Sequence, residues 1–157
     1  MLIDLIVTGK TDAPQVAELV ELYRRRINRY VRCNIITLAD LKTRKNLSPG
    51  QQNREEGERL LASLLPGDYV ALLDEQGGEY RSIEFAAWLQ QRMNAGVRRL
   101  VFVVGGPYGF SQQVVARADA RISLSQMTFS HQIVRVLFAE QLYRAFTILH
   151  GEPYHHE

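Results

Sequence analysis

Five short apolar segments recur along this chain, and a segment with helical character follows each of them. The apolar segments cover residues 2–7, 33–38, 69–73, 100–104 and 120–124. Helical segments are expected at 14–30, 48–65 and 82–96, directly after Ser111, and at 131–150. Strands that alternate with helices are typical of a mostly parallel sheet with helices on both faces. The sequence therefore predicts an α/β fold, and its 157 residues suit a single domain over 1–157.

Small polar residues indicate where several of these elements begin and end. Helix starts with a side-chain cap are expected at Thr11 or Asp12, Ser48, Ser82, Ser111 and Ser130. The residues Asp74-Glu75-Gln76-Gly77-Gly78 follow the third apolar segment, and their composition predicts a turn. That strand is therefore expected to end at Leu73.

The cysteine and histidine content limits the kinds of site and compartment that fit. A single cysteine, Cys33, excludes an internal disulfide and suits a reducing compartment. One Cys and four His do not supply the several ligands of a structural zinc, so we expect no metal. The apolar start MLIDLIVTGK is too short to span a membrane and lacks the basic start of a signal peptide. These features predict a cytoplasmic protein without membrane spans.

Basic residues are concentrated in one stretch of a chain whose overall net charge is only +2. Residues 21–46 hold eight basic and two acidic residues, so this stretch carries +6. The basic residues are Arg24, Arg25, Arg26, Arg29, Arg32, Lys42, Arg44 and Lys45. Such a cluster favours a polyanionic partner. On charge alone, a solvated helix face is an equal alternative.

The last helical segment, residues 131–150, is apolar on nearly every side. A helix of this kind is buried all round, and one of its sides is expected on the sheet. The other side is expected either on a second subunit across a two-fold axis or under helices of the same chain. In a domain of this size we favour the homodimer.

Ligand sites of open α/β sheets lie beyond the carboxyl ends of the strands, and three segments qualify here. They are the strand end Leu72-Leu73-Asp74, the loop 105–109 and the segment 123–129. The loop sequence Gly-Gly-Pro-Tyr-Gly matches neither G-x-G-x-x-G nor a phosphate-binding loop, which argues against NAD binding and nucleotide hydrolysis. Taken alone, this loop is typical of a tight turn, and 123–129 fits either an adenine site or a core connection.

The C-terminal tail carries Tyr154, His155 and His156 after Pro153. These side chains can stack on bases or transfer protons near neutral pH, whereas a free tail usually frays. Two further pairs lie one helical turn apart and fit either a site or a structural contact: His131 with Arg135, and Glu140 with Arg144.

Together, these segments resemble a known family. The runs VFVVGGPYGF and SLSQMTFSHQIVRVLFAEQLYRAFTILHGEPYH are similar to the ribosomal RNA large subunit methyltransferase H family, which belongs to the SPOUT superfamily of knotted methyltransferases. The similarity extends over essentially the whole chain, and the C-terminal third is its most specific part. The resemblance implies a trefoil knot near the C-terminus, which patterning alone would not predict.

The resemblance also implies an activity: S-adenosylmethionine is the methyl donor, and a homodimer methylates N3 of a pseudouridine in a 23S rRNA stem-loop. By position, the cofactor contacts fall on Leu73, Gly105, Leu124, Ser125, Gln126, Met127, Thr128 and Phe129. His131, Arg144, Tyr154 and His155 fall on positions implied in RNA binding or catalysis. The candidate RNA contacts are Arg24, Arg25, Arg26 and Arg29, and the assembled ribosome is the expected substrate.

Methyl transfer requires alignment of the target nitrogen with the methyl group, and the N3 proton must leave. We expect Tyr154 and His155 to position the base and assist proton loss. In the expected homodimer, these two residues would come from the partner subunit. Arg144 is expected to hold a phosphate or a carbonyl oxygen. The alternative is a non-catalytic RNA-binding dimer, which the basic stretch would serve equally well and which binds no S-adenosylmethionine.

Overall fold

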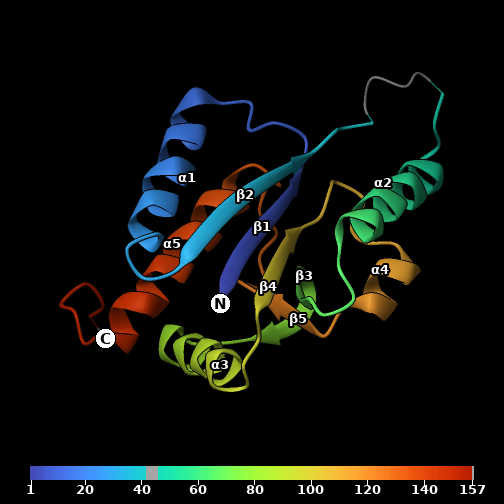
Figure 1. Cartoon of the computed structure of the whole chain (residues 1–157). Helices are drawn as coiled ribbons and strands as arrows, with labels where there is room; N and C mark the ends of the chain where they lie inside the picture. The colour runs from blue at the N-terminus through green and yellow to red at the C-terminus, as the bar shows by residue number, and fades with distance from the viewer. Residues whose placement is uncertain (42–45, 157) are drawn as a thin grey trace.

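The protein forms a five-stranded sheet with helices on both faces (Figure 1). The computed structural model describes residues 1–41 and 46–156. The strands are β1 (Leu2–Thr8), β2 (Arg32–Leu38), β3 (Tyr69–Glu79), β4 (Arg99–Val104) and β5 (Ala120–Ser123). The helices are α1 (Pro14–Ile27), α2 (Pro49–Ser63), α3 (Ser82–Asn94), α4 (Gln112–Arg117) and α5 (Ile133–Leu149). The predicted alternation of strands and helices is confirmed.

The strands pair in parallel throughout, in the order β2-β1-β4-β3-β5. In the centre of the sheet, Ile3 lies beside Leu100 and Leu5 lies beside Phe102, and all four are buried. Both faces of a parallel sheet are covered, which explains why its strands are apolar runs. Because β4, β3 and β5 are neighbours, their carboxyl ends meet at one edge of the sheet.

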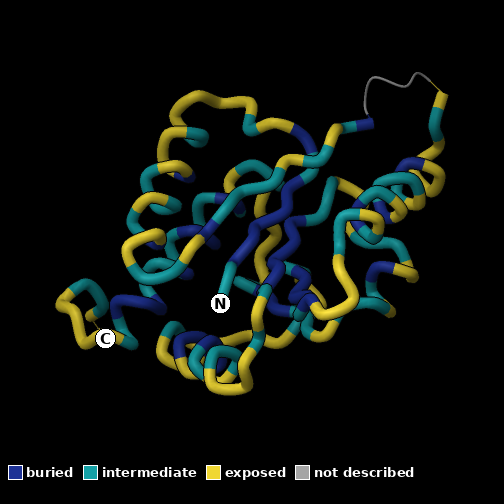
Figure 2. Tube along the Cα trace, viewed as in Figure 1, coloured by how far each residue is buried: buried dark blue, intermediate teal, exposed yellow. Residues whose placement is uncertain are grey.

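Two hydrophobic cores divide the helices into two layers. On one face, Phe102 of β4 packs with α1, α3 and α5, and its ring centroid is 4.6 Å from that of Phe138 in α5. On the other face, Val103 packs with Leu60 of α2 and Val114 of α4. Figure 2 shows that the buried positions follow the strands and the inner sides of these helices. The prediction of helices on both faces is therefore confirmed.

Charged side chains close the amino-terminal edge of the sheet. The Nε atom of Arg99 lies 2.7 Å from Asp4 Oδ2, and its Nη1 lies 2.5 Å from Asp68 Oδ2. Asn34 Nδ2 donates to Asp4 Oδ1 at 2.8 Å. Because these nearly buried charges are paired and hydrogen-bonded with one another, they hold the strand starts together. An open binding site therefore belongs at the opposite edge.

Two predicted helix caps are confirmed by hydrogen bonds to backbone N–H groups. Ser48 Oγ accepts from Gln51 N at 3.2 Å at the start of α2. Ser111 Oγ accepts from Val114 N at 3.4 Å at the start of α4. Both satisfy donors that an uncapped first turn would leave free.

The other predicted caps are wrong by one or two residues. The N-caps are Ala13 for α1, Arg81 for α3 and Gln132 for α5. Tertiary contacts use the expected hydroxyls instead: Thr11 Oγ1 accepts from Arg135, and Ser82 Oγ donates to Gln141. Ser130 Oγ still accepts from Ile133 N at 3.2 Å, but α5 begins only at Ile133.

Strand β3 is longer than predicted, and the turn expected at residues 74–78 is wrong. The strand continues past these residues, with a register shift against β5 between Leu73 and Gly78. A Cβ on Gly77 would lie 2.5 Å from the backbone carbonyl carbon of Arg121 in β5. Since backbone cannot move aside cheaply, the composition that suggested a turn reflects a close approach of two strands.

Helix α5 packs on the sheet between α1 and α3 of the same chain. Phe138 and Phe146 on its inner side are buried. A stripe with Val136 and Leu137 is only partly covered, and Ile133 is 45% exposed. Helices of the same chain therefore cover part of α5 but leave one apolar stripe open.

Membrane spans, the knot and the number of domains are properties of the chain as a whole. Within the two described ranges, no helix is both long and apolar enough to cross a membrane. The trefoil knot implied by the resemblance stays a prediction. The assignment of residues 1–157 to one domain stays a prediction as well.

Candidate functional site

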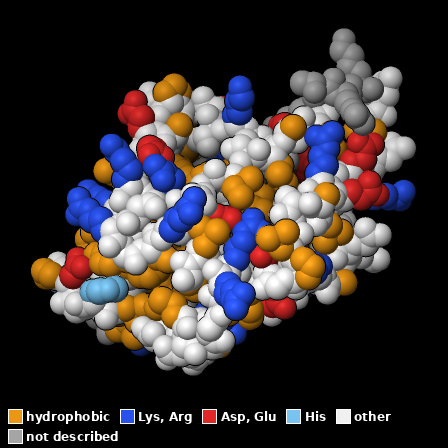
Figure 3. Space-filling model, viewed as in Figure 1, with side chains coloured by type: hydrophobic (Ala, Val, Ile, Leu, Met, Phe, Trp, Pro, Cys, Tyr) orange, Lys and Arg blue, Asp and Glu red, His pale blue; other side chains and the backbone are white. Residues whose placement is uncertain are grey.

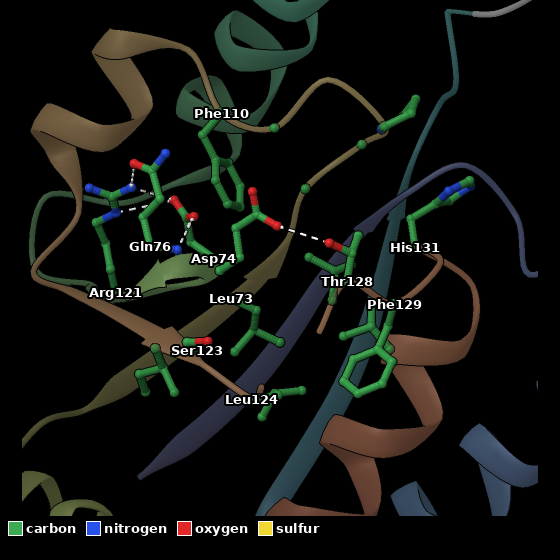
Figure 4. A pocket seen from close by; sticks show the side chains of 18 of the residues that line it. Leu73, Asp74, Gln76, Phe110, Arg121, Ser123, Leu124, Thr128, Phe129 and His131 are labelled. Atoms are coloured by element: carbon green, nitrogen blue, oxygen red, sulfur yellow. Dashed lines mark hydrogen bonds and ion pairs between the residues drawn. The ribbon is translucent and has the colours of Figure 1, made fainter. Parts of the chain in front are cut away.

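A pocket of about 1080 Å³ lies at the carboxyl ends of β3, β4 and β5 (Figure 4). Its wall includes Leu73 within β3, the loop 105–109 after β4, and most of the segment 123–129, which begins with the last residue of β5. The strand order β4-β3-β5 makes these three strand ends neighbours. The three segments that the sequence placed beyond strand ends therefore form one site, as open α/β sheets predict.

Most of the residues predicted as cofactor contacts line this pocket. They are Leu73, Gly105, Leu124, Ser125, Met127, Thr128 and Phe129. Gln126 is not part of the lining, although both of its neighbours are. His131, predicted for RNA binding or catalysis, lines the same pocket. The predicted cofactor segment and one catalytic candidate thus lie together.

The segment after β5 is held by its own side chains. Ser123 Oγ donates to Ser125 O at 3.0 Å, and Ser125 Oγ accepts from Met127 N at 2.9 Å. In Figure 4, Leu73, Leu124 and Phe129 lie toward the same part of the site. The serines therefore shape a connection whose apolar side chains form one wall of the pocket.

A polar wall comes from the irregular part of β3, and of its residues only Asp74 was predicted to lie at a ligand site. Arg121 Nη2 lies 2.7 Å from Asp74 Oδ2 and 3.0 Å from Gln76 Oε1 (Figure 4). Nearby, Thr128 Oγ1 donates to Glu75 Oε2 at 3.3 Å. The acidic residues Asp74 and Glu75 are visible in the sequence. Because a turn was predicted at 74–78, Glu75 was not predicted to line a site.

The glycines of the loop 105–109 lie close to neighbouring side chains or adopt a backbone conformation that favours glycine. A Cβ on Gly105 would lie 3.1 Å from the Phe110 ring, and one on Gly106 would lie 2.7 Å from Glu56 Oε2. Gly109 has φ +71°, in the left-handed region that glycine favours. The loop is therefore a tightly packed turn and also part of the pocket wall.

Asn53 of α2 fixes this glycine loop from the other side, and the sequence analysis did not single it out. Its Nδ2 donates to Tyr108 O at 2.9 Å and to Gly109 O at 3.2 Å. No sequence signal identifies this contact, because 55 residues separate Asn53 from Tyr108. The pocket rim thus depends on a helix from the other layer.

The remaining catalytic candidates form a second group at the far end of α5, here called the tail cluster. It consists of Glu140, Arg144, Tyr154 and His155. Glu140 Oε1 accepts from Tyr154 OH at 3.0 Å and pairs with Arg144 Nη2. Arg144 Nη1 is 3.3 Å from His155 Nδ1, and its guanidinium carbon lies 4.8 Å from the centre of the Tyr154 ring. The Glu140–Arg144 pair thus organises the tail.

Proton affinities in the tail cluster follow from these contacts. Burial, aided by hydrogen bonding to Tyr23 and Glu140, raises the pKa of Tyr154 well above its ordinary value. Hydrogen bonding to Glu140 raises the pKa of Arg144. Tyr154 is therefore a neutral donor and Arg144 a cation at physiological pH. The Nε2 atom of His155 is buried and has no hydrogen-bond partner among the described residues.

The pocket and the tail cluster are separate within one chain. Val134 lines the pocket, and Arg144 is ten residues further along α5. At 1.5 Å per residue, they are about 15 Å apart along the helix axis. The structure therefore does not bring Arg144, Tyr154 and His155 to the pocket of their own chain.

A groove of about 360 Å³ lies along the open stripe of α5. Leu124 and Phe129 line both this groove and the pocket. Val136 and Leu137 line its middle, and Glu140 of the tail cluster lines it too. The groove therefore extends from the pocket wall toward the tail cluster.

The basic residues of α1 and of the turn that follows it divide into two kinds. Arg24 is paired with Glu21 at 2.6 Å, and the Arg26 guanidinium lies over the Tyr23 ring. Arg25 and Arg29 are exposed, and Figure 3 shows basic side chains gathered over this part of the molecule. Three other basic residues of the stretch lie outside the described residues: Lys42, Arg44 and Lys45.

Arg135, the helical neighbour of His131, has a structural role. It is 1% exposed and donates to the carbonyl oxygens of Thr8, Gly9 and His131 at 2.7–3.0 Å. Burial lowers its pKa. Arg135 thus joins the end of β1 to the start of α5. Among the described residues, no group of three or more His, Cys, Asp and Glu could hold a metal ion.

Comparisons with known proteins agree with this architecture. The model of one protein family, described as "Predicted SPOUT methyltransferase", matches residues 1–155. A protein of Parabacteroides distasonis is 52% identical over 157 residues and covers 100% of both chains. A protein of Christiangramia forsetii is 51% identical over 156 residues and covers 99% of both. Each bears the name "Ribosomal RNA large subunit methyltransferase H".

Both kinds of match extend over nearly the whole chain and include the pocket and the tail cluster. The pocket occupies the strand-end position expected for a ligand site in an α/β sheet. The chain therefore belongs to the SPOUT methyltransferase family, and it is a methyltransferase.

Proposed function

We propose that this enzyme is a homodimer that transfers a methyl group from S-adenosylmethionine to N3 of a pseudouridine in 23S ribosomal RNA. The observation that carries the proposal is the pocket in which Leu73, Gly105 and most of 124–129 converge. These are the positions that family resemblance assigns to the cofactor. Relatives about half identical to this chain are named for methylation of large-subunit ribosomal RNA.

The pocket residues fit S-adenosylmethionine. Leu73, Leu124 and Phe129 offer apolar surface to a purine ring. Glu75 adds a carboxylate, which suits a ligand with a positively charged sulfur, whereas the Asp74 carboxylate is paired with Arg121. When bound, S-adenosylmethionine would supply a methyl group on a positively charged sulfur, and a neutral thioether would be released once that group is transferred. The chain's own task is to align the acceptor nitrogen and exclude water.

Within the tail cluster, we assign proton transfer to His155 and not to Tyr154. The raised pKa of Tyr154 keeps its phenol protonated, so Tyr154 donates a hydrogen bond. An imidazole nitrogen can accept a proton as a general base, and the Nε2 atom of His155 has no partner among the described residues. Arg144 stays charged and holds a phosphate or carbonyl oxygen of the substrate.

The homodimer explains why the two halves of the site are separate in one chain. A second copy seated on the groove of α5 would cover Val136 and Leu137, which a single chain leaves partly open. A two-fold axis there would place the tail cluster of each subunit near the pocket of the other. In this arrangement, His131 and Phe129 of one chain face Tyr154 and His155 of the partner subunit.

Positive charge on α1 supports an RNA substrate. The exposed guanidinium groups of Arg25 and Arg29 are the candidate phosphate contacts. Arg24 and Arg26 contribute charge while held by Glu21 and Tyr23. We take the assembled ribosome as the substrate, which places the enzyme in the cytoplasm.

Two measurements test this function. Calorimetry with S-adenosylmethionine should show one site per chain, whereas a non-catalytic RNA-binding dimer would bind none. Mass spectrometry of 23S rRNA nucleosides should then show a methylated pseudouridine after ribosomes from cells lacking the gene are incubated with enzyme and S-adenosylmethionine. Cofactor binding without any methylated nucleoside would contradict the substrate, and absence of cofactor binding would contradict the activity.

A further inference from the structure

The C-terminal tail contacts Tyr30, which lies in the turn after α1 and is 122 residues from Glu152 in sequence. Tyr30 OH donates to Glu152 Oε1 at 2.7 Å. The Tyr30 ring also stacks on Phe146, with centroids 5.5 Å apart and planes 6° apart, and lies 4.7 Å from the His150 ring. Tyr30 therefore contacts both the end of α5 and the tail that follows it.

Helix α5 ends in a turn that reverses the chain. This turn alone does not set the direction of the tail residues that follow it. Gly151 has φ +66°, and its N–H donates to Ile148 O at 3.1 Å. Glu152 N donates to Thr147 O at 2.9 Å. This pair of bonds is the Schellman motif, which ends many helices at a glycine. Beyond Glu152, further contacts must set the direction of the chain.

Glu152 is the point at which that direction is set. Its backbone N–H is bound to α5, its carboxylate is bound to Tyr30, and its carbonyl oxygen accepts from Tyr154 N at 2.9 Å. Tyr154 and His155 follow at once and reach Glu140 and Arg144. With the carboxylate released, the tail would keep its start but lose one of the contacts that orient it.

We propose that Tyr30 and Glu152 form a tether that positions Tyr154 and His155 for methyl transfer. Neither tether residue touches the substrate, so both are positioning residues. The inference rests on the proposed function, because it assigns the tether's effect to the chemical step. The rate of methyl transfer falls steeply when reacting groups are displaced by a small distance. We therefore expect loss of the Tyr30–Glu152 hydrogen bond to lower the rate.

The test uses Tyr30→Phe, which removes the hydroxyl and keeps the ring stack. We expect kcat for rRNA methylation to fall about tenfold, with the Kd for S-adenosylmethionine unchanged. Glu152→Ala should lose a similar factor, whereas Glu152→Gln keeps an acceptor oxygen and should restore most of the rate. The double variant Tyr30→Phe with Glu152→Ala should lose no more than either single variant, because both remove one contact.

Tyr69→Phe is the matched control, because its hydroxyl also bonds a side chain, Arg92, but lies away from the tail. It should leave kcat unchanged. A full rate in Tyr30→Phe, or additive losses in the double variant, would overturn the tether. So would a rate loss in Tyr30→Phe that is accompanied by equally weakened cofactor binding.

Amide hydrogen exchange tests the tether without any methylation assay. Exchange at Tyr154 and His155 should be about tenfold faster in Tyr30→Phe than in wild type, while α5 exchanges equally in both. Equal protection in both proteins would overturn the tether even in an enzyme of full activity. Failure of wild type to methylate rRNA would count against the proposed function alone, because the exchange result stands apart from it.

Discussion

The pocket at the sheet edge and the tail cluster at the end of α5 are held together in different ways. Side chains line the pocket, but strand pairing and close packing hold its frame: Gly77 lies against the backbone of β5, and Gly105 lies against the Phe110 ring. The tail cluster is built from side chains that converge on Glu140. Close packing within the sheet holds the pocket, whereas hydrogen bonds and ring contacts between side chains position the tail.

This difference suits the two tasks that we propose for them. A cofactor pocket benefits from a rigid frame that exists before the ligand arrives. The proposed catalytic groups of the tail are positioned by contacts between side chains from separate parts of the chain. The four predictions that follow test whether the two regions can be disturbed separately.

The largest effect is expected from Arg144→Ala in the tail cluster. Loss of this cation should reduce kcat for methylation about 1000-fold, as for removal of a group that stabilises developing charge. The Kd for S-adenosylmethionine should not change, because Arg144 is not part of the pocket. Arg98→Ala, at an exposed position beside the start of β4, is the control. Weaker binding of S-adenosylmethionine to Arg144→Ala would contradict the claim that the pocket and the tail cluster act separately.

Gly77→Ala should disturb the pocket frame. The added Cβ would lie 2.5 Å from backbone atoms of β5, so we expect a loss of about 3 kcal/mol in unfolding free energy. Gly67→Ala is the matched control, since nothing lies within 4 Å of its Cβ position. Urea unfolding measures both variants. Equal stabilities would show that β3 and β5 do not approach as closely as described.

Leu73→Arg should close the pocket without affecting the tail. A long cation would fill part of the cavity and repel a positively charged methyl donor, which should weaken its binding at least about 100-fold, or about 2.7 kcal/mol. Leu65→Arg is the control, because Leu65 is 60% exposed and lies outside the pocket. Calorimetry measures the affinity of both variants for S-adenosylmethionine. Unchanged affinity in Leu73→Arg would argue against the assigned site.

The smallest effect concerns the pH dependence of the Tyr30–Glu152 contact. Burial and the hydrogen bond to Glu152 raise the pKa of Tyr30 to about 12. The folded state therefore holds this proton more tightly than the unfolded state does, so its contribution to stability is complete below pH 10. The contribution should disappear as pH rises from about 10 to about 12.

Urea unfolding of wild type and Tyr30→Phe at several pH values measures this contribution. The difference in stability between the two proteins should be constant up to about pH 10 and then shrink. A difference that does not depend on pH would mean that the hydroxyl is not held by Glu152 in solution.

The sequence predicted the sheet and the pocket well because both depend on local patterns. Buried strands are apolar runs, and the residues after Leu73, Val104 and Ser123 must meet once the strands pair. The irregular part of β3 was missed because glycine next to polar residues is equally typical of a turn. Its true cause is the approach of Gly77 to Arg121.

The tail could be predicted as unusual but not placed. Its contacts join Tyr30 to Glu152 and Tyr154 to Glu140, and no local rule connects such distant residues. The sequence also could not predict which arginines of α1 and the following turn are held by neighbours and which are exposed. Which guanidinium is held by Glu21 or Tyr23 depends on helix faces and neighbours.

The most direct test of this account asks whether the pocket of one chain works with the tail of another. Leu73→Arg subunits and Arg144→Ala subunits, each inactive alone, are mixed in equal amounts under conditions that exchange subunits. If each site combines one subunit's pocket with the partner's tail, random pairing restores about a quarter of wild-type methylation. If both halves of a site come from the same chain, every site carries a defect, and the mixture stays inactive.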